Sequence, residues 1–268
     1  MLYSKRFYGR VWLCSLLFIS VGPAEGVLQF GKIVDLTHPF DQTAIYWPTA
    51  KQFSLEQVSH QTTDKGFFYA ANNICLAEHG GTHIDAPIHF YKDRDTVDEI
   101  PLKRLMGPGI LVDISQKVSE NRDYQVSIDD FKAWEKEHGQ QINDVIVLLG
   151  TGFGKFWADK ARYMGTSERG AAAVPKLRFP GLDPKAAEWL AKHRTIRAIG
   201  LDTPSIDYGQ STDFQSHVIL FKHNIPAFEN LAKLEKLPAR GFTVIALPMK
   251  IKGGSGGPLR IVAVMEGE

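Results

Sequence analysis

One short stretch governs the interpretation of the whole chain: His79-Gly80-Gly81-Thr82-His83-Ile84-Asp85-Ala86-Pro87-Ile88-His89-Phe90. Three of the nine histidines in the sequence and one aspartate fall within its first eleven residues. Its two glycines and its proline disfavour a continuous helix, so we predict a loop or a short strand. If residues 82–85 are extended, His83 and Asp85 point to the same side, because side chains alternate along a strand.

This pattern predicts a metal site. The paired glycines allow the backbone to turn tightly and to bring His79 to the side of His83 and Asp85. Two imidazoles and a carboxylate that converge from one loop are suitable ligands for a divalent ion. The alternative is a loop whose histidines only form hydrogen bonds with backbone groups. The density of the cluster favours the metal site.

The first 26 residues predict a secretory signal peptide. A basic head with Lys5, Arg6 and Arg10 precedes an apolar run over residues 11–21, and small residues follow at the end of the segment. The run is too short to span a bilayer. The alternative is an uncleaved anchor or a disordered extension. We expect a secreted protein, or one in the secretory pathway, with no stable membrane anchor after cleavage.

The remaining residues, 27–268, show no convincing linker, and we expect one domain. The sequence has 31 basic and 30 acidic residues, with no basic stripe, so nucleic acid is not an expected partner. Cys75 is the only cysteine outside the leader, so an intramolecular disulfide is not expected. Because Cys75 lies in an apolar run at residues 70–77, we expect it to be buried.

Strand and helix patterns alternate along the chain, which predicts a mixed α/β fold. We expect strands at residues 31–36, 110–114, 145–149, 196–201, 242–247 and 259–264. Ser127 and Asp130 form a capping-box pattern at the start of a helix that Gly139 ends. Asp183 is expected to cap a second helix and Asp213 a third.

Four loops are candidates for the wall of a pocket. Residues 45–49 carry Trp47, which could contact a flat substrate or simply pack on the core. The glycine-rich residues 150–155 lack the spacing of a phosphate-binding loop, and we expect them to line a pocket. Residues 202–209 follow a strand at its carboxyl end, where α/β sheets bind ligands. The glycine-rich residues 253–258 form either a surface turn or a loop near the metal.

His217 and Glu229 present a second pair of candidate ligands. His217 lies on the apolar face of the third helix, where a lone histidine is more often a core residue than a ligand. Glu229 stands between apolar residues, and a carboxylate there is costly unless it is paired, protonated or metal-bound. One metal ion would account for both residues.

The quoted stretch resembles the signature of the cyclase-family metal-dependent hydrolases, which include bacterial-type kynurenine formamidase and isatin hydrolase. It matches the pattern His-x-Gly-Thr-His-x-Asp-x-Pro-x-His-Phe without departures. The resemblance covers most of the chain after the leader. It implies the swivelling β/β/α fold, assembled as a homodimer or a higher homo-oligomer.

The resemblance also implies a two-metal site. In it, His79, His83 and Asp85 hold one ion, His217 and Glu229 hold a second that Asp85 bridges, His89 stays unligated as the proton carrier, and Trp47 contacts the substrate. The formamidases use zinc and isatin hydrolase uses manganese, so either Mn²⁺ or Zn²⁺ is expected, with two ions per subunit. A divalent ion lowers the pKa of a bound water towards about 7 and polarises a carbonyl group. A free imidazole with a pKa near ~6.5 can carry the proton.

The implied activity is hydrolysis of a carbon–nitrogen bond in an aromatic small-molecule amide. Residues 46–49 and 205–209 look more like isatin hydrolase, which opens a cyclic amide to a carboxylate. The first alternative is an arylformamidase that converts N-formylkynurenine to kynurenine and formate. The second is a catalytically silent, secreted metal-binding homologue, against which the intact His89 argues.

Overall fold

Eight strands form the main sheet of the computed structural model, which describes residues 31–266. The signal peptide predicted for residues 1–26 lies outside this range. The strands are β1 (Ile33–Asp35), β4 (His83–Asp85), β5 (Met106–Asp113), β7 (Ile146–Gly150), β9 (Ala198–Leu201), β10 (Ala227–Glu229), β11 (Phe242–Pro248) and β12 (Gly256–Met265). Their order is β1-β12-β11-β5-β7-β9-β10-β4, and β12 also pairs with β4. This extra pairing closes seven of the strands into a ring, with β1 on the outside of β12.

The ring combines parallel and antiparallel pairs. Strands β5, β7, β9 and β10 run parallel to their neighbours within that set. Strands β4, β11 and β12 pair antiparallel with one another or with the parallel set. The mixed α/β fold predicted from the sequence is confirmed, and the closure of the sheet is the feature that only the structure reveals.

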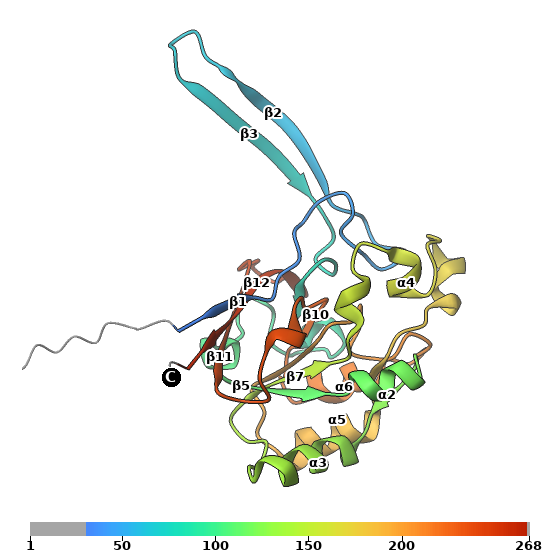
Figure 1. Ribbon diagram of the computed structural model, residues 1–268. Helices are drawn as coiled ribbons and strands as arrows, with labels where there is room; N and C mark the ends of the chain where they lie inside the picture. The colour runs from blue at the N-terminus through green and yellow to red at the C-terminus, as the bar shows by residue number, and fades with distance from the viewer. Residues whose placement is uncertain (1–30, 267–268) are drawn as a thin grey trace, which may run out of the picture.

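Helices cover the outside of the ring. They are α1 (Leu102–Leu105), α2 (Ser115–Glu120), α3 (Ile128–His138), α4 (Lys160–Met164), α5 (Pro184–His193) and α6 (Gln215–Lys222), with 3₁₀ turns η1 (Pro87–His89), η2 (Phe153–Phe156), η3 (Ala171–Lys176) and η4 (Leu234–Lys236). The longest, α3 and α5, lie together with α6 along the lower side of the sheet in Figure 1. Two short strands, β6 (Gln125–Val126) and β8 (Gly181–Leu182), pair with each other.

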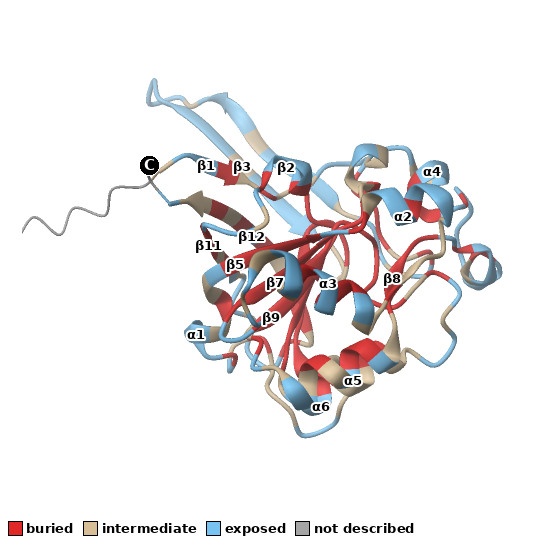
Figure 2. Cartoon of the chain, turned by 60° about the horizontal axis from the view of Figure 1, so that its bottom comes forward, coloured by how far each residue is buried: buried red, intermediate tan, exposed pale blue. Residues whose placement is uncertain are grey.

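Strand β7 shows how the sheet separates two cores. All five of its residues are buried, and both β7 and β9 are red with burial in Figure 2. Ile146 and Leu148 belong to a core with apolar residues of the other ring strands, whereas Val147 and Leu149 pack with the helices. Because side chains alternate along a strand, one set fills the ring and the other anchors the helices.

The predicted helix starts are confirmed in two cases out of three. Ser127 and Asp130 form a capping box at the start of α3, and Gly139 ends it in the left-handed conformation at φ 60°. The Asp183 side chain accepts a hydrogen bond from Lys185 N at the start of α5. Asp213 is not the cap of α6, because Phe214 occupies that position with φ 50° and ψ 40°.

The six predicted strands all exist, with ends that differ by a few residues. The largest differences are at β5, which begins at Met106, and at β12, which begins at Gly256. Residues 256–258 were expected in a loop, but they pair with β4 and complete the ring. Within residues 31–266, no helix is long and apolar enough to cross a membrane.

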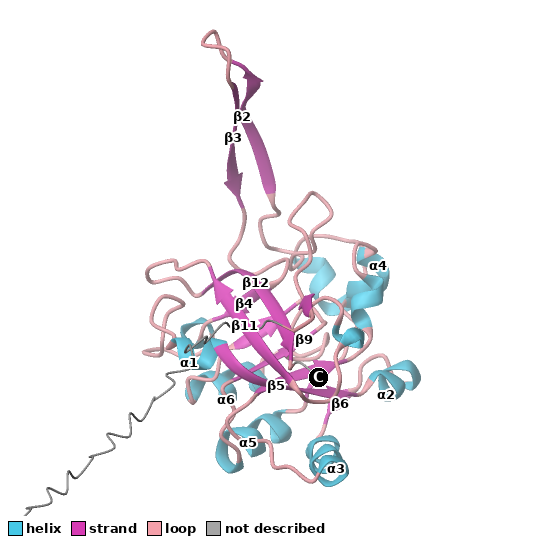
Figure 3. Cartoon of the chain, turned by 60° about the vertical axis from the view of Figure 1, so that its left-hand side comes forward, coloured by secondary structure: helices cyan, strands magenta, loops and turns pink. Residues whose placement is uncertain are grey.

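The prediction of a buried Cys75 is wrong. Residues 54–75 form a hairpin of β2 (Ser54–Thr62) and β3 (Phe68–Cys75) that projects from the body (Figures 1 and 3). Cys75 is exposed. The apolar composition of residues 70–77 predicted a core segment. No described segment packs over the hairpin, so these apolar side chains are not buried.

Candidate functional site

Strand β4 brings His83 and Asp85 against the second half of the candidate site. It pairs antiparallel with β10, and the register places His83 opposite Glu229 and Asp85 opposite Ala227. Residues opposite each other in such a pair project from the same face, so Glu229 lies on the side of His83 and Asp85. The extended conformation predicted for residues 82–85 is confirmed for the three that form β4.

Helix α6 adds His217 to this group. Its Nε2 lies 3.1 Å from Asp85 Oδ2 and 3.2 Å from Glu229 Oε1. The Nε2 of His83 lies 3.1 Å from Asp85 Oδ1 and 3.5 Å from Glu229 Oε2. All four side chains are only 3–4% exposed. Two imidazoles and two carboxylates thus face one another in a buried cluster.

The outer ring nitrogens of the two buried histidines are both engaged. His83 Nδ1 lies 2.9 Å from the carbonyl oxygen of Gly81, and His217 Nδ1 lies 2.5 Å from Asp207 Oδ2. A carbonyl oxygen can only accept, so His83 Nδ1 carries the proton of the neutral ring. With a metal ion in the site, this neutral tautomer would leave the Nε2 lone pair free for the ion. Such outer partners orient histidines that bind metals.

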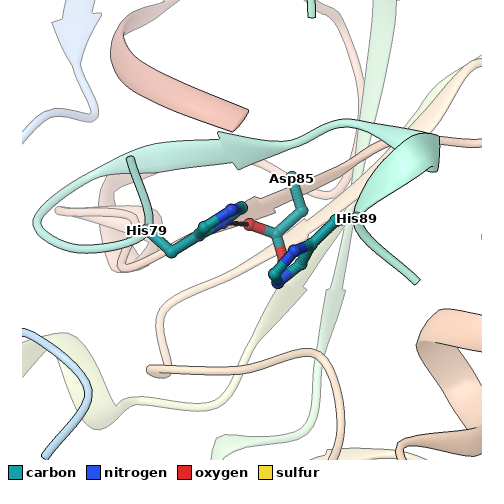
Figure 4. A group of neighbouring side chains, drawn as sticks. All are labelled: His79, Asp85 and His89. Atoms are coloured by element: carbon teal, nitrogen blue, oxygen red, sulfur yellow. Dashed lines mark hydrogen bonds and ion pairs between the residues drawn. The ribbon is translucent and has the colours of Figure 1, made fainter. Parts of the chain in front are cut away.

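His79 and His89 are less buried than the other members of the cluster, and Figure 4 shows both rings beside Asp85. His79 Nδ1 is 2.6 Å from Asp85 Oδ1, and its Nε2 is 2.8 Å from Ser255 Oγ. Ser255 in turn donates to Glu78 Oε2 at 2.6 Å. The ring of His89 stacks on that of His79, with centroids 3.7 Å apart and planes at 16°. Residues 253–258 therefore reach the site, through Ser255.

Steric constraints explain why glycine occupies both position 80 and position 81. A Cβ atom at Gly80 would lie 2.0 Å from the ring of Tyr46, which forms an isolated bridge with Gly80. Gly81 has φ 60°, a conformation that side chains disfavour. These two positions let the chain turn from His79 into β4.

The pKa values of the two carboxylates are shifted in opposite directions by their different surroundings. Burial raises the pKa of Glu229, and the charge of Asp85 raises it further. Burial alone would also raise the pKa of Asp85, but the charge of His79 and hydrogen bonds from three histidines hold it well below its usual range. Two acids so close together cannot both be ionised at low cost unless positive charge lies between them.

The pKa values of the histidines are also shifted in opposite directions. Burial alone would lower the pKa of His83 and His217, but hydrogen bonds to Asp85 and Asp207, respectively, and nearby carboxylate charge raise both. His89 has no such hydrogen-bond partner, and burial lowers its pKa to about 4. His89 is therefore a neutral imidazole at neutral pH.

The donor set fits a divalent metal ion. Ligand atoms of His83, Asp85 and Glu229 all lie within 4.8 Å of one another, and so do those of His79, Asp85 and His89. Nitrogen and carboxylate oxygen without thiolate suit zinc or manganese. The structure brings together all five predicted ligands. His89 lies within 4.8 Å of ligand atoms of His79 and Asp85, so its position suits a metal ligand as well as the predicted proton carrier.

A cavity of about 300 Å³ opens above this cluster, and its walls are largely aromatic. Trp47, the predicted substrate contact, lines it together with Phe90 and Phe214. The ring of Trp47 is 6.3 Å from that of Phe214, and Phe90 lies 5.2 Å from Phe214. Cavities of this size, with apolar walls and a few polar groups, are typical of small-molecule sites.

One loop prediction is wrong. No residue of the glycine-rich segment 150–155 lines the cavity. Its backbone instead holds Asp202, which accepts hydrogen bonds from Thr151 N at 2.8 Å and Gly154 N at 3.0 Å. The segment supports the strand end from which residues 202–209 depart.

Sequence reasoning missed three residues around the cluster: Asp207, Ser255 and Asn230. Asp207 and Ser255 each bond to a histidine of the site. The Asn230 amide donates to the carbonyl oxygen of Gly81 at 2.7 Å. Asp207 could have been found, since it is an acid in a loop already expected to border a ligand. Ser255 lies in the glycine-rich segment 253–258, which was also a candidate, whereas nothing local marks Asn230.

Comparison with known proteins gives a family match and named relatives. Residues 34–208 match the family model described as "Putative cyclase". The chain is 32% identical over 219 residues to an isatin hydrolase of Roseibium aggregatum, covering 79% of this chain and 80% of that one. It is 26% identical over 235 residues to a kynurenine formamidase of Bacillus anthracis, covering 88% and 98%.

A solved structure is also similar. Isatin hydrolase A from Labrenzia aggregata, bound to benzyl benzoate, superimposes with a TM-score of 0.79 at 33% identity. The match covers 88% of this chain and 94% of that one. Sequence and fold thus agree over nearly the whole described part of the chain.

Proposed function

The chain belongs to the cyclase family, and from this premise we propose that it is a metal-dependent hydrolase of an amide bond in a small aromatic compound. One observation carries the proposal. Segments far apart in the sequence place buried imidazoles and carboxylates at the base of a cavity with aromatic walls.

The assignment of ligands follows the predicted pattern. His79, His83 and Asp85 would hold one ion, and His217 and Glu229 a second, with Asp85 between them; Mn²⁺ and Zn²⁺ both suit this set. When bound, such ions supply Lewis acidity towards a carbonyl group and towards water. The outer partners of His83 and His217 already orient the two buried Nε2 atoms toward the carboxylates, as such partners do for histidines that bind metals.

His89 is the group we assign to proton transfer. Its pKa of about 4 keeps the ring neutral at pH 7, so one ring nitrogen has a free lone pair. The ring is held in place by stacking on His79. It would accept a proton as water attacks the amide carbon and return that proton to the leaving nitrogen.

The walls of the cavity support a flat aromatic substrate. Trp47, Phe90 and Phe214 present ring faces and edges at distances suited to aromatic contacts. Phe214 is half-buried and has φ 50° and ψ 40°. A bulky residue rarely adopts this conformation, and such strain persists mainly at functional positions.

Within this class, we favour ring opening of an isatin-like cyclic amide to a carboxylate. Similarity to isatin hydrolase at 32% identity supports this choice over the formamidase at 26%. The alternative substrate is N-formylkynurenine, with release of formate.

The test is direct. The purified protein, loaded with Mn²⁺ or with Zn²⁺, is mixed with isatin and separately with N-formylkynurenine, and absorbance is followed. Turnover of isatin supports the first choice, and turnover of N-formylkynurenine alone supports the alternative. Absence of turnover with both removes both substrates.

A further inference from the structure

Glu78 and Ser255 are not among the predicted site residues, yet they form a chain of hydrogen bonds that ends on a candidate ligand. Ser255 Oγ lies 2.6 Å from Glu78 Oε2 and 2.8 Å from His79 Nε2. The other ring nitrogen of His79, Nδ1, lies 2.6 Å from Asp85 Oδ1 (Figure 4). Glu78, Ser255 and His79 are each half-buried, so these hydrogen bonds are partly shielded from water.

The chemistry of the two ends fixes the direction of this chain. An ionised carboxylate can only accept hydrogen bonds, so the single hydroxyl proton of Ser255 belongs to the bond with Glu78. The 2.6 Å between these two oxygens is typical of a hydroxyl that donates to a carboxylate. Ser255 Oγ must then accept from His79, which places the proton of that second bond on His79 Nε2.

This direction sets His79 apart from the other two candidate histidine ligands. His83 and His217 have their outer partners at Nδ1, so Nε2 is the nitrogen left for a metal ion. In His79 the outer partner is at Nε2, so Nδ1 is the nitrogen left. Partners of this kind orient a histidine that binds metal and fix which ring nitrogen carries the proton.

We propose that Glu78 and Ser255 are positioning residues that keep the His79 proton on Nε2 and leave Nδ1 for the metal ion. His79 therefore binds through Nδ1, whereas His83 and His217 bind through Nε2. This role rests on the proposed function only in that the site binds a divalent ion, and it does not depend on the substrate.

The glycine-rich segment 253–258 has the shape that these contacts require. A Cβ atom at Gly254 would lie 2.8 Å from Glu78 Oε1, and one at Gly256 would lie 2.6 Å from His79 Cε1. Both distances are shorter than real Cβ atoms tolerate. Glycine on each side of Ser255 thus leaves room for the two partners of its hydroxyl.

A purely structural role for Glu78 is the alternative, because its Oε2 also accepts the backbone N–H of Ser255 at 3.1 Å. Another side chain docks the same segment without touching His79: Asp98 Oδ1 accepts a hydrogen bond from Gly253 N at 2.9 Å. Docking of the segment and the chain of hydrogen bonds to His79 can therefore be separated by mutation.

The first test measures the affinity of the metal-free full chain for Zn²⁺ and for Mn²⁺ by calorimetry. Ser255→Ala removes the hydroxyl but keeps the backbone contact with Glu78, and we expect it to weaken binding about 10- to 100-fold. Glu78→Leu removes the acceptor and should weaken binding to a similar degree. Glu78→Gln still offers an acceptor oxygen to the hydroxyl and should stay within about threefold of the wild type.

Asp98→Ala is the matched control. It loosens the same segment at Gly253 and leaves the chain from Glu78 to His79 intact, so the affinity for metal should change less than about twofold. Circular dichroism checks that each variant is folded. If Ser255→Ala fails to fold, the comparison of Glu78→Leu with Glu78→Gln replaces it.

The second test needs no variant. In the zinc-loaded protein with isotope-labelled histidine, long-range proton–nitrogen correlation spectra distinguish a protonated ring nitrogen from a metal-bound one. We expect one ligand histidine to carry its proton on Nε2 and the others to carry theirs on Nδ1. In Ser255→Ala, the Nε2 signal of the first should shift.

Three outcomes would overturn the proposal while the metal site stands. They are a zinc-loaded wild type in which every ligand histidine carries its proton on Nδ1, a Ser255→Ala variant with wild-type affinity, and equal losses of affinity in Ser255→Ala and Asp98→Ala. A wild type that binds neither ion would refute the metal site and the positioning role together. Failure to turn over isatin or N-formylkynurenine would concern the substrate alone, since neither test uses one.

Discussion

Asp207 Oδ2 lies 2.5 Å from His217 Nδ1, and the same carboxylate accepts the backbone N–H groups of Ser216 and His217. Asp207 therefore holds both the backbone at the start of α6 and the imidazole ring of His217. It comes from the loop after β9, so one contact ties two elements of the site together.

Asp207→Asn should weaken metal binding about 10- to 100-fold, because the amide holds the ring less firmly and makes it less basic. Titration of the metal-free protein with Mn²⁺ or Zn²⁺ in a calorimeter measures the change. Asp213→Asn, an exposed acid close to the same helix, serves as the control and should bind as the wild type does. Equal affinity of the Asp207 variant and the wild type would remove this role.

His89→Ala should lower kcat by about 10²- to 10⁴-fold, the usual contribution of a general acid–base group. Bound metal, measured by elemental analysis, should stay close to the wild-type content if His89 is a proton carrier. A loss of metal in parallel with activity would instead make His89 a ligand, which its position beside His79 and Asp85 permits. Unaltered activity would contradict both roles.

Phe214→Gly and Phe214→Ala should separate backbone strain from loss of the ring. Both variants remove the aromatic wall and should raise KM for an aromatic substrate to a similar degree. At φ 50° glycine avoids the steric cost that alanine retains, so Phe214→Gly should be more stable by about 1 kcal/mol. Thermal unfolding of the two variants provides the measurement. A more stable alanine variant would show that the backbone at position 214 is not strained.

Asp130→Asn should destabilise the protein in a pH-dependent way. Burial alone would raise the pKa of Asp130, but hydrogen bonds from Lys117, Ser127 and Tyr124 lower it. A pKa lowered by folding contributes stability above the unfolded value near ~3.9 and loses it as the pH falls through the folded value. The variant should therefore cost about 1 kcal/mol at pH 7, as loss of a cap does, and less at acid pH.

Unfolding in urea at pH 7 and at about pH 3 tests this dependence. Asp129→Asn, an exposed acid in the same helical turn, is the matched control and should cost less at both pH values. A penalty for Asp130→Asn that does not shrink at acid pH would show that the ionised carboxylate is not what stabilises the cap.

Removal of metal should destabilise the protein, because it leaves Asp85 and Glu229 buried side by side. A ligand at 100 times its Kd adds about 2.7 kcal/mol, which corresponds to a rise in Tm of about 5–10 °C for a chain of this size. Mn²⁺ or Zn²⁺ added to chelator-treated protein should produce this rise. Mg²⁺ prefers oxygen ligands and should produce less; an equal effect of Mg²⁺ would argue against the histidines as ligands.

Local pattern was a good guide to the elements near the site. The spacing of His83 and Asp85 predicted a strand with both side chains on one face, and β4 has that form. Capping residues located the starts of α3 and α5. These features depend on interactions within a few residues, which is why they are visible in the sequence. Asp213 failed as a cap because α6 begins one residue later, with Phe214 at the cap position and at the wall of the cavity.

The sequence by itself determined which residues could bind a metal and which segments could form strands and helices, since side-chain chemistry and hydrophobic periodicity are local properties. Only the tertiary structure decided that Glu229 stands opposite His83, that Asp207 orients His217, and that residues 54–75 stay outside the core. Strand register and burial depend on which distant surface covers a segment. An apolar run therefore has the same sequence pattern whether the surface that covers it belongs to the same chain or to another molecule.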